Sequence, residues 1–150
     1  MKRLFNGGWS FWCGEPDLDV SEAGKHLTEF QKVDLPHDWL IADAKNLYRD
    51  GCGYYRKIFS MQPKENKRYS LIFEGVYMDT TIWVNGQQAG EWKYGYSTFE
   101  IDLTPFVKAG ENEFLVSVNF RSPNSRWYSG AGIYRDVWFK ETPKTYIREN

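Results

Sequence analysis

One segment near the C-terminus combines residue types that suit the recognition of a sugar. Residues 123–138 read PNSRWYSGAGIYRDVW, in which an arginine and flat aromatic rings occupy a loop of small residues that leads into a strand. A pyranose presents hydroxyl groups around its rim and C–H groups on its faces, so its site needs fixed polar partners beside rigid amphipathic rings. Arg126, Trp127 and Tyr128 supply both kinds of group. Each also has a structural interpretation: Arg126 as a solvated or interdomain arginine, and the two rings as core or domain-interface aromatics.

A second pair of residues, His37 and Asp38, has the chemistry of a metal ligand set or a proton-transfer pair. One histidine followed by one aspartate falls short of the ligand count of a zinc site. Because buried polar side chains are usually hydrogen-bonded, we expect this pair to hold its loop in place. No metal and no cofactor are expected.

Composition limits the classes of function. The 150 residues suffice for one domain that buries roughly 70% of the surface of its unfolded chain. Nineteen Lys and Arg residues balance 20 Asp and Glu residues, and like charges form no long run, so we expect neither nucleic acid nor a membrane as partner. The basic start lacks the apolar stretch of a secretory signal, which predicts a cytoplasmic protein with Cys13 and Cys52 reduced.

The hydrophobic pattern predicts many strands and almost no helix. Alternation of apolar and polar residues marks 69–73 and 114–120, and β-branched and aromatic residues mark five further strands, at 54–61, 79–84, 87–92, 97–102 and 133–140. Asn85-Gly86 between two of these runs predicts a tight hairpin. Thr104, Pro105 and Gly110 predict one short connecting helix. Trp83, Trp92 and Trp138 fall in strands, where packing in the core or on a sheet face is expected. The fold class is therefore all-β, an antiparallel β-sandwich of the jelly-roll kind.

Two long stretches without strand pattern stand out, residues 34–53 and 121–132. Long irregular loops inside a compact domain are usually functional or disordered, and the aromatic content of these two disfavours disorder. They are the candidate sites.

Six blocks of the sequence, in the same order over nearly the whole chain, resemble the N-terminal domain of glycoside hydrolase family 2. The sequences of the first and last blocks are most similar to the β-galactosidase branch. The blocks are LPHDW (35–39), GYYRK (53–57), FEGV (73–76), WVNG (83–86), FEIDLT (99–104) and RWYSGAGIYRDVW (126–138). β-Glucuronidases and β-mannosidases share the architecture. The resemblance implies a galactose-binding-domain-like jelly roll, the single domain 1–150 of a larger multidomain hydrolase.

In that family the domain packs on an immunoglobulin-like domain and a catalytic (β/α)8 barrel. Two barrel glutamates perform a retaining mechanism, so the resemblance implies that this chain holds no catalytic residue. Asn112-Glu113 is similar to the family's acid/base dipeptide, but it follows Gly110 at the start of a strand, where a turn is the ordinary interpretation.

Two residues are carried over from the family's pattern as sugar contacts. Relatives place an asparagine amide on the sugar at the position of Asp50, which is here either a ligand that accepts from hydroxyls or a turn former before Gly51. Several relatives place a sugar-binding aspartate six residues before Gly132, where this chain has Arg126. A guanidinium there cannot ligate a cation, but its five donors suit sugar hydroxyls or a barrel carboxylate.

Three functions follow as hypotheses. The chain is the N-terminal module of a β-galactosidase-like hydrolase, an autonomous carbohydrate-binding protein, or a structural domain that braces the barrel. Surfaces that would meet absent domains predict an exposed aromatic patch around the two loops and a tendency toward a homo-oligomer.

Overall fold

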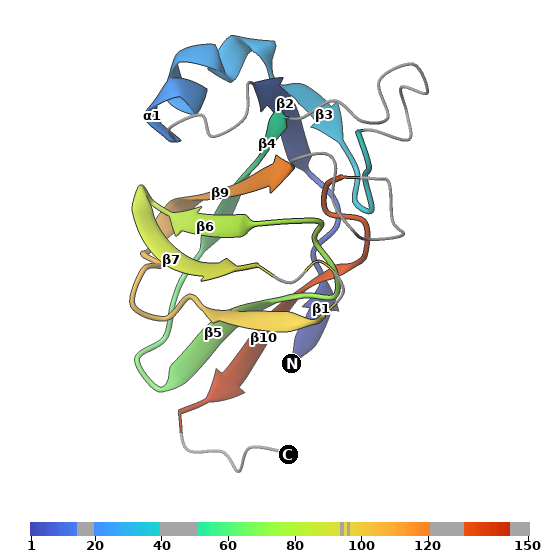
Figure 1. The fold of residues 1–150 in the computed structure, drawn as a ribbon. Coiled ribbons are helices and arrows are strands. Elements are labelled where there is room, and N and C mark those ends of the chain that lie inside the picture. Colours follow the sequence, from blue (N-terminus) through green and yellow to red (C-terminus); the bar gives the residue numbers. More distant parts are fainter. Residues whose placement is uncertain (15–19, 40–50, 94, 96, 121–130, 145–150) are drawn as a thin grey trace.

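The chain folds into two antiparallel β-sheets that pack face to face, as a computed structural model shows (Figure 1). The structure describes residues 1–14, 20–39, 51–93, 95, 97–120 and 131–144. The four-stranded sheet has the order β1-β10-β5-β8, with strands β1 (Lys2–Leu4), β10 (Val137–Pro143), β5 (Lys67–Phe73) and β8 (Phe99–Asp102). The six-stranded sheet has the order β3-β2-β4-β9-β6-β7, with strands β3 (Gln31–Val33), β2 (Trp9–Gly14), β4 (Gly51–Met61), β9 (Gly110–Phe120), β6 (Thr80–Val84) and β7 (Gln87–Trp92). The predicted all-β sandwich is confirmed.

The core lies between the sheets and follows the predicted alternation. Tyr69, Leu71 and Phe73 of β5 are at most 3% exposed, and they face Val116 and Val118 of β9, which are fully buried. Burying each such side chain contributes about 1.5–3 kcal/mol, so this shared layer holds the sheets together.

The Asn85-Gly86 hairpin is also confirmed. Both residues have positive φ, 51° and 80°, and β6 pairs with β7 on either side of them. Positive φ at both central positions is what a tight two-residue hairpin requires. The ladder shifts register between Ile82 and Trp83, which marks a bulge opposite in β7.

Several predicted elements differ in extent or kind: β4 begins at Gly51 rather than at 54, β8 at Phe99 rather than at 97, and β9 at Gly110 rather than at 114. The last strand begins at Val137 rather than at 133, because the carbonyl of Ile133 accepts from the His37 N–H instead of joining the ladder. The helix after Thr104 is a single turn, in which the N–H groups of Phe106 and Val107 both donate to the carbonyl of Leu103.

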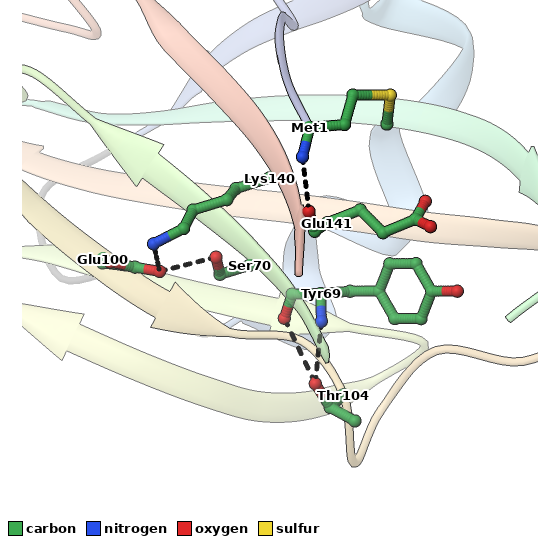
Figure 2. A network of polar contacts seen from close by, with 7 residues as sticks. All are labelled: Met1, Tyr69, Ser70, Glu100, Thr104, Lys140 and Glu141. Atoms are coloured by element: carbon green, nitrogen blue, oxygen red, sulfur yellow. Dashed lines mark hydrogen bonds and ion pairs between the residues drawn. The ribbon is translucent and has the colours of Figure 1, made fainter. Parts of the chain in front are cut away.

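The Thr104 hydroxyl does not cap that turn. It contacts the backbone of Tyr69 across the sheet, accepting from its N–H at 2.9 Å and reaching its carbonyl at 3.4 Å (Figure 2).

A short helical segment that the sequence pattern did not predict covers the outer face of the six-stranded sheet. It comprises α1 (Val20–Ala23) and a 3-10 turn, η1 (Gly24–Glu29). Ala23 packs there against Cys52, Tyr54 and Leu115. Within the described ranges, no helix has the length and apolarity needed to cross a bilayer.

Cys13 and Cys52 lie on neighbouring strands, and both are thiols. Burial raises the pKa of the Cys52 thiol to about 11, with a hydrogen bond from Tyr54 opposing the shift. Cys52 is therefore protonated at neutral pH.

Candidate functional site

The ends of the two long loops meet at one edge of the sandwich. The N–H of Trp39 donates to the carbonyl of Ala131 at 3.1 Å, and Gly51 pairs with Phe120 between β4 and β9. The start of the first loop therefore lies beside the end of the second, and the end of the first lies beside the start of the second. We call these four residues the loop edge.

The sequence-predicted site residues all belong to the two intervals that this edge bounds. Asp50, Arg126, Trp127 and Tyr128 lie outside the described residues. Their roles stay predictions.

His37 holds the loop edge from the side of the first loop. Its ring Nδ1 lies 2.7 Å from the Tyr55 hydroxyl, and its backbone N–H donates to the carbonyl of Ile133 at 2.8 Å. The Tyr55 hydroxyl also accepts from the Ile133 N–H at 3.4 Å. Burial lowers the pKa of His37, and the charge of Asp38 only partly opposes this. A neutral imidazole that accepts from the tyrosine fits these contacts.

Asp38 completes the attachment. One carboxylate oxygen accepts from the Ala131 N–H at 3.1 Å. The predicted role of the His37-Asp38 pair as a hydrogen-bonded loop anchor is confirmed.

The segment 131–133 is fastened from its other flank as well. Tyr77 and Gly132 exchange two backbone hydrogen bonds, both 2.9 Å long. Gly132 has φ of 126°, and a Cβ there would lie 2.7 Å from the carbonyl oxygen of His37 and against the Tyr55 hydroxyl. Only glycine fits this position, because both the backbone angle and the space exclude a side chain.

Aromatic rings form the floor beneath the loop edge. The centroid of the Phe11 ring lies 4.7 Å from the ring centroid of His37, 5.4 Å from that of Trp39 and 4.9 Å from that of Tyr55. Gly53 makes room for them, since a Cβ there would come within 2.6 Å of Trp39. Sequence reasoning missed Phe11. The alternation of Trp9 with Phe11 before a polar stretch was the signal that could have placed it in a strand facing the core.

Asn112 and Glu113 have structural roles, as the turn interpretation expects. Asn112 is fully buried, and its amide bonds both the N–H and the carbonyl of Lys108 at 2.9 Å. Glu113 accepts from Nε of Arg56 at 2.8 Å. The dipeptide therefore closes the turn before β9.

A polar hollow of about 320 Å³ lies on the outer face of the four-stranded sheet, and Figure 2 shows part of its lining. The Ser70 hydroxyl donates to Glu100 at 2.6 Å, and Lys140 reaches the same oxygen at 3.4 Å. These groups satisfy one another, and Tyr69, which belongs to the lining, has its ring buried in the core at 3% exposure, so the hollow is a weak candidate for a sugar. Throughout the described ranges, no three His, Cys, Asp or Glu side chains gather as metal ligands would.

The predicted aromatic patch was placed around the two long loops, most of whose residues lie outside the described ranges, so it stays a prediction. On the described surface, the exposed large apolar side chains are Met1, Leu4, Leu27 and Ile58. Trp83, Trp92 and Trp138 are all partly buried on their sheets, as expected.

The fold and the gathered loop ends define a class: a β-sandwich domain in which two long loops begin and end at one edge. Residues 2–143 match the family model described as glycosyl hydrolases family 2, sugar binding domain. The chain belongs to this family.

Relatives within the family carry two kinds of name. The chain is 38% identical to the β-galactosidase BoGH2A of Bacteroides ovatus, over 95% of this chain and 18% of that protein. It is 35% identical to a β-glucuronidase of Bacteroides fragilis, over 78% of this chain and 18% of that protein. A crystal structure of a glycosyl hydrolase family 2 member from Bacteroides cellulosilyticus superimposes with a TM-score of 0.78 at 34% identity, over 95% of this chain and 21% of that one. The chain thus spans about a fifth of the length of the relatives it matches.

Proposed function

We propose that this chain is the N-terminal domain of a retaining β-glycosidase that hydrolyses terminal β-galactosides. It contributes the two loops of the loop edge to one wall of the substrate pocket, while the catalytic glutamates belong to a barrel domain of the same parent chain. The observation that carries the proposal is the convergence of both loops on one edge, through the Trp39–Ala131 bond and the Gly51–Phe120 pair. Residues from both loops then reach a single ligand.

The preference for galactose rests on the similarity to β-galactosidases. Relatives named β-glucuronidase make a glucuronide the competing substrate. A glucuronide carries a carboxylate that a galactoside lacks, and Arg126 is the predicted loop residue that would favour it.

The parent enzyme sets the remaining proposals. The immunoglobulin-like and barrel domains of the parent enzyme are the partners of this chain, and a β-galactoside is the substrate of the parent enzyme. We place the parent enzyme in the cytoplasm, as a homo-oligomer. In the family's mechanism two carboxyl groups stand about 5 Å apart across the scissile bond. Glu113 is held by Arg56 on the outer sheet face, away from the loop edge, so the isolated chain has no turnover.

A structural domain that only braces its neighbours is the second candidate. This alternative is favoured by the contacts of His37 and Asp38, since their side chains form hydrogen bonds to the Tyr55 hydroxyl and the Ala131 N–H within the domain itself. Under this alternative the loops contact protein rather than sugar.

Kinetics of the full-length parent separate the candidates. Arg126→Ala should lower kcat/KM for p-nitrophenyl β-galactoside by about 10-fold or more, because a lost hydrogen bond from a charged group costs about 1.5–3 kcal/mol. Arg68→Ala is the matched control, since Arg68 is exposed at the far end of β5. An unchanged kcat/KM for Arg126→Ala favours the bracing domain, and faster turnover of the β-glucuronide than of the β-galactoside refutes the galactose preference. Turnover by the 150-residue chain alone refutes the location of the catalytic glutamates.

A further inference from the structure

A hollow of about 210 Å³ lies between the outer face of the six-stranded sheet and the helical segment α1–η1. The sheet contributes Arg56, Trp83, Glu113 and Leu115 to its lining, and the helical segment contributes Ala23 and Leu27. The loop edge is elsewhere: Arg56 is five residues along β4 from Gly51, on the order of 15 Å at the rise of a strand. The hollow is therefore a separate site.

Strand register places the chemistry of this hollow in one row. Leu115 of β9 pairs with Arg56 of β4 on one side and with Trp83 of β6 on the other. Glu113 follows two residues away on the same face of β9, because side chains alternate along a strand. The bulge in the β6–β7 ladder falls beside Trp83, and bulges commonly re-aim a side chain next to a binding site.

The polar groups of the row retain capacity for hydrogen bonds. Nε of Arg56 donates to one oxygen of Glu113 at 2.8 Å, with the two side chains 28% and 38% exposed. Within the described part of the chain, the terminal guanidinium nitrogens, the second carboxylate oxygen and the Trp83 indole N–H have no recorded side-chain or backbone partner. Donors and an acceptor thus stand next to each other at the rim of an apolar, ring-lined hollow. Adjacent hydroxyls of a sugar need this combination.

We propose that this hollow binds a single neutral hexopyranose unit, with a C–H face of the sugar against Trp83 and adjacent hydroxyls on Arg56 and Glu113. The volume suits one ring, since it is below the roughly 300–1,000 Å³ of pockets for drug-sized ligands. A purely apolar ligand fits poorly, because it would cover the ion pair without satisfying its open atoms. A charged sugar gains no net attraction over a neutral one, since the opposite charges of Arg56 and Glu113 cancel.

Amide-resolved NMR titration of the 150-residue chain with methyl β-galactopyranoside tests the proposal. We expect saturable shifts of the Trp83 indole and the Leu115 amide, with a Kd in the range of about 1–10 mM. Trp83→Leu keeps apolar bulk but removes the ring, and it should weaken binding by about tenfold, equal to about 1.4 kcal/mol. Trp138→Leu is the control, because Trp138 lies on the other sheet and should leave the affinity unchanged.

Charge supplies a second readout that does not depend on the folding of a variant. Methyl β-glucuronide should bind no more tightly than methyl β-glucopyranoside, because the paired charges of Arg56 and Glu113 offer its carboxylate no net attraction.

Several results would overturn the proposal. They are the absence of saturable shifts at Trp83 and Leu115 up to about 50 mM sugar, undiminished binding by a folded Trp83→Leu variant, and tighter binding of the glucuronide than of the glucoside. Shifts of Trp83 with protein concentration alone would instead make the hollow a contact between copies of the chain, which also overturns it. The proposal is independent of the proposed function: shifts confined to the loop edge would support the latter while removing this site.

Discussion

The Tyr55 hydroxyl is the point at which the loop edge is most open to test. Tyr55 is fully buried, and its hydroxyl contacts both His37 Nδ1 and the Ile133 N–H. Tyr55→Phe removes this oxygen and leaves the ring in place. Each hydrogen bond contributes about 0.5–1.5 kcal/mol net, so the loss of two predicts a decrease of about 1–3 kcal/mol in the free energy of unfolding. For a chain of this length that lowers Tm by about 3–10 °C.

Urea unfolding followed by far-UV circular dichroism measures the loss. Native-state amide exchange shows where it acts, and the amides of His37, Trp39 and Gly132 should lose protection first, because they bond within the fastened segment. Tyr69→Phe is the matched control: among the described residues its hydroxyl accepts from the Lys64 N–H alone, at the other end of the sandwich. It should cost about half as much and leave exchange at the loop edge unchanged. A Tyr55→Phe variant within about 0.5 kcal/mol of the parent chain, with unchanged exchange, would refute the reasoning.

Two further predictions concern the same segment. Because burial lowers the pKa of His37 in the folded state, the unfolded chain binds more protons below the ordinary value of 6.5. The stability that His37 contributes should thus be complete above pH 6.5 and decline as the pH falls through that value toward the lowered pKa. Urea titrations between pH 5 and 7.5 measure the free energy of unfolding at each pH, and a His37→Gln variant whose free energy of unfolding changes with pH as steeply as that of the parent chain would disprove this origin. Gly132→Ala should lower the free energy of unfolding by about 1–3 kcal/mol or more, because its φ of 126° and the nearby His37 carbonyl exclude a Cβ. Gly7→Ala, where a Cβ meets nothing within 4 Å, is the control, and equal unfolding midpoints for the two variants would contradict the account.

The central strands were predictable because their pattern is local. The alternation of apolar and polar residues from Tyr69 to Phe73 predicts which face of the strand is buried, and Asn85-Gly86 predicts where the chain reverses direction. The edge strands β1 and β3 were not predictable, since each has three residues, of which only Val33 is partly buried. Their pairing partners β10 and β2 determine them, and a local pattern carries no information on such partners.

The site divides in the same way. The anchoring role of His37 and Asp38 follows from their polar character in a loop that must be tied down. The roles of Phe11, Gly53 and Tyr77 depend on contacts with residues many positions away, so they emerge only from the folded chain. The start of β10 was misplaced for a related reason: Ile133 has the hydrophobicity of a strand residue, but its backbone serves the first loop.

The double fastening of residues 131–133 has an evolutionary consequence. With both ends of each loop held by the sandwich, an insertion between them adds only closure entropy, about 0.6 kcal/mol for a doubling of length. The two loops can therefore change in length and sequence while the scaffold keeps its stability, so that variation of the loops and maintenance of the fold proceed independently.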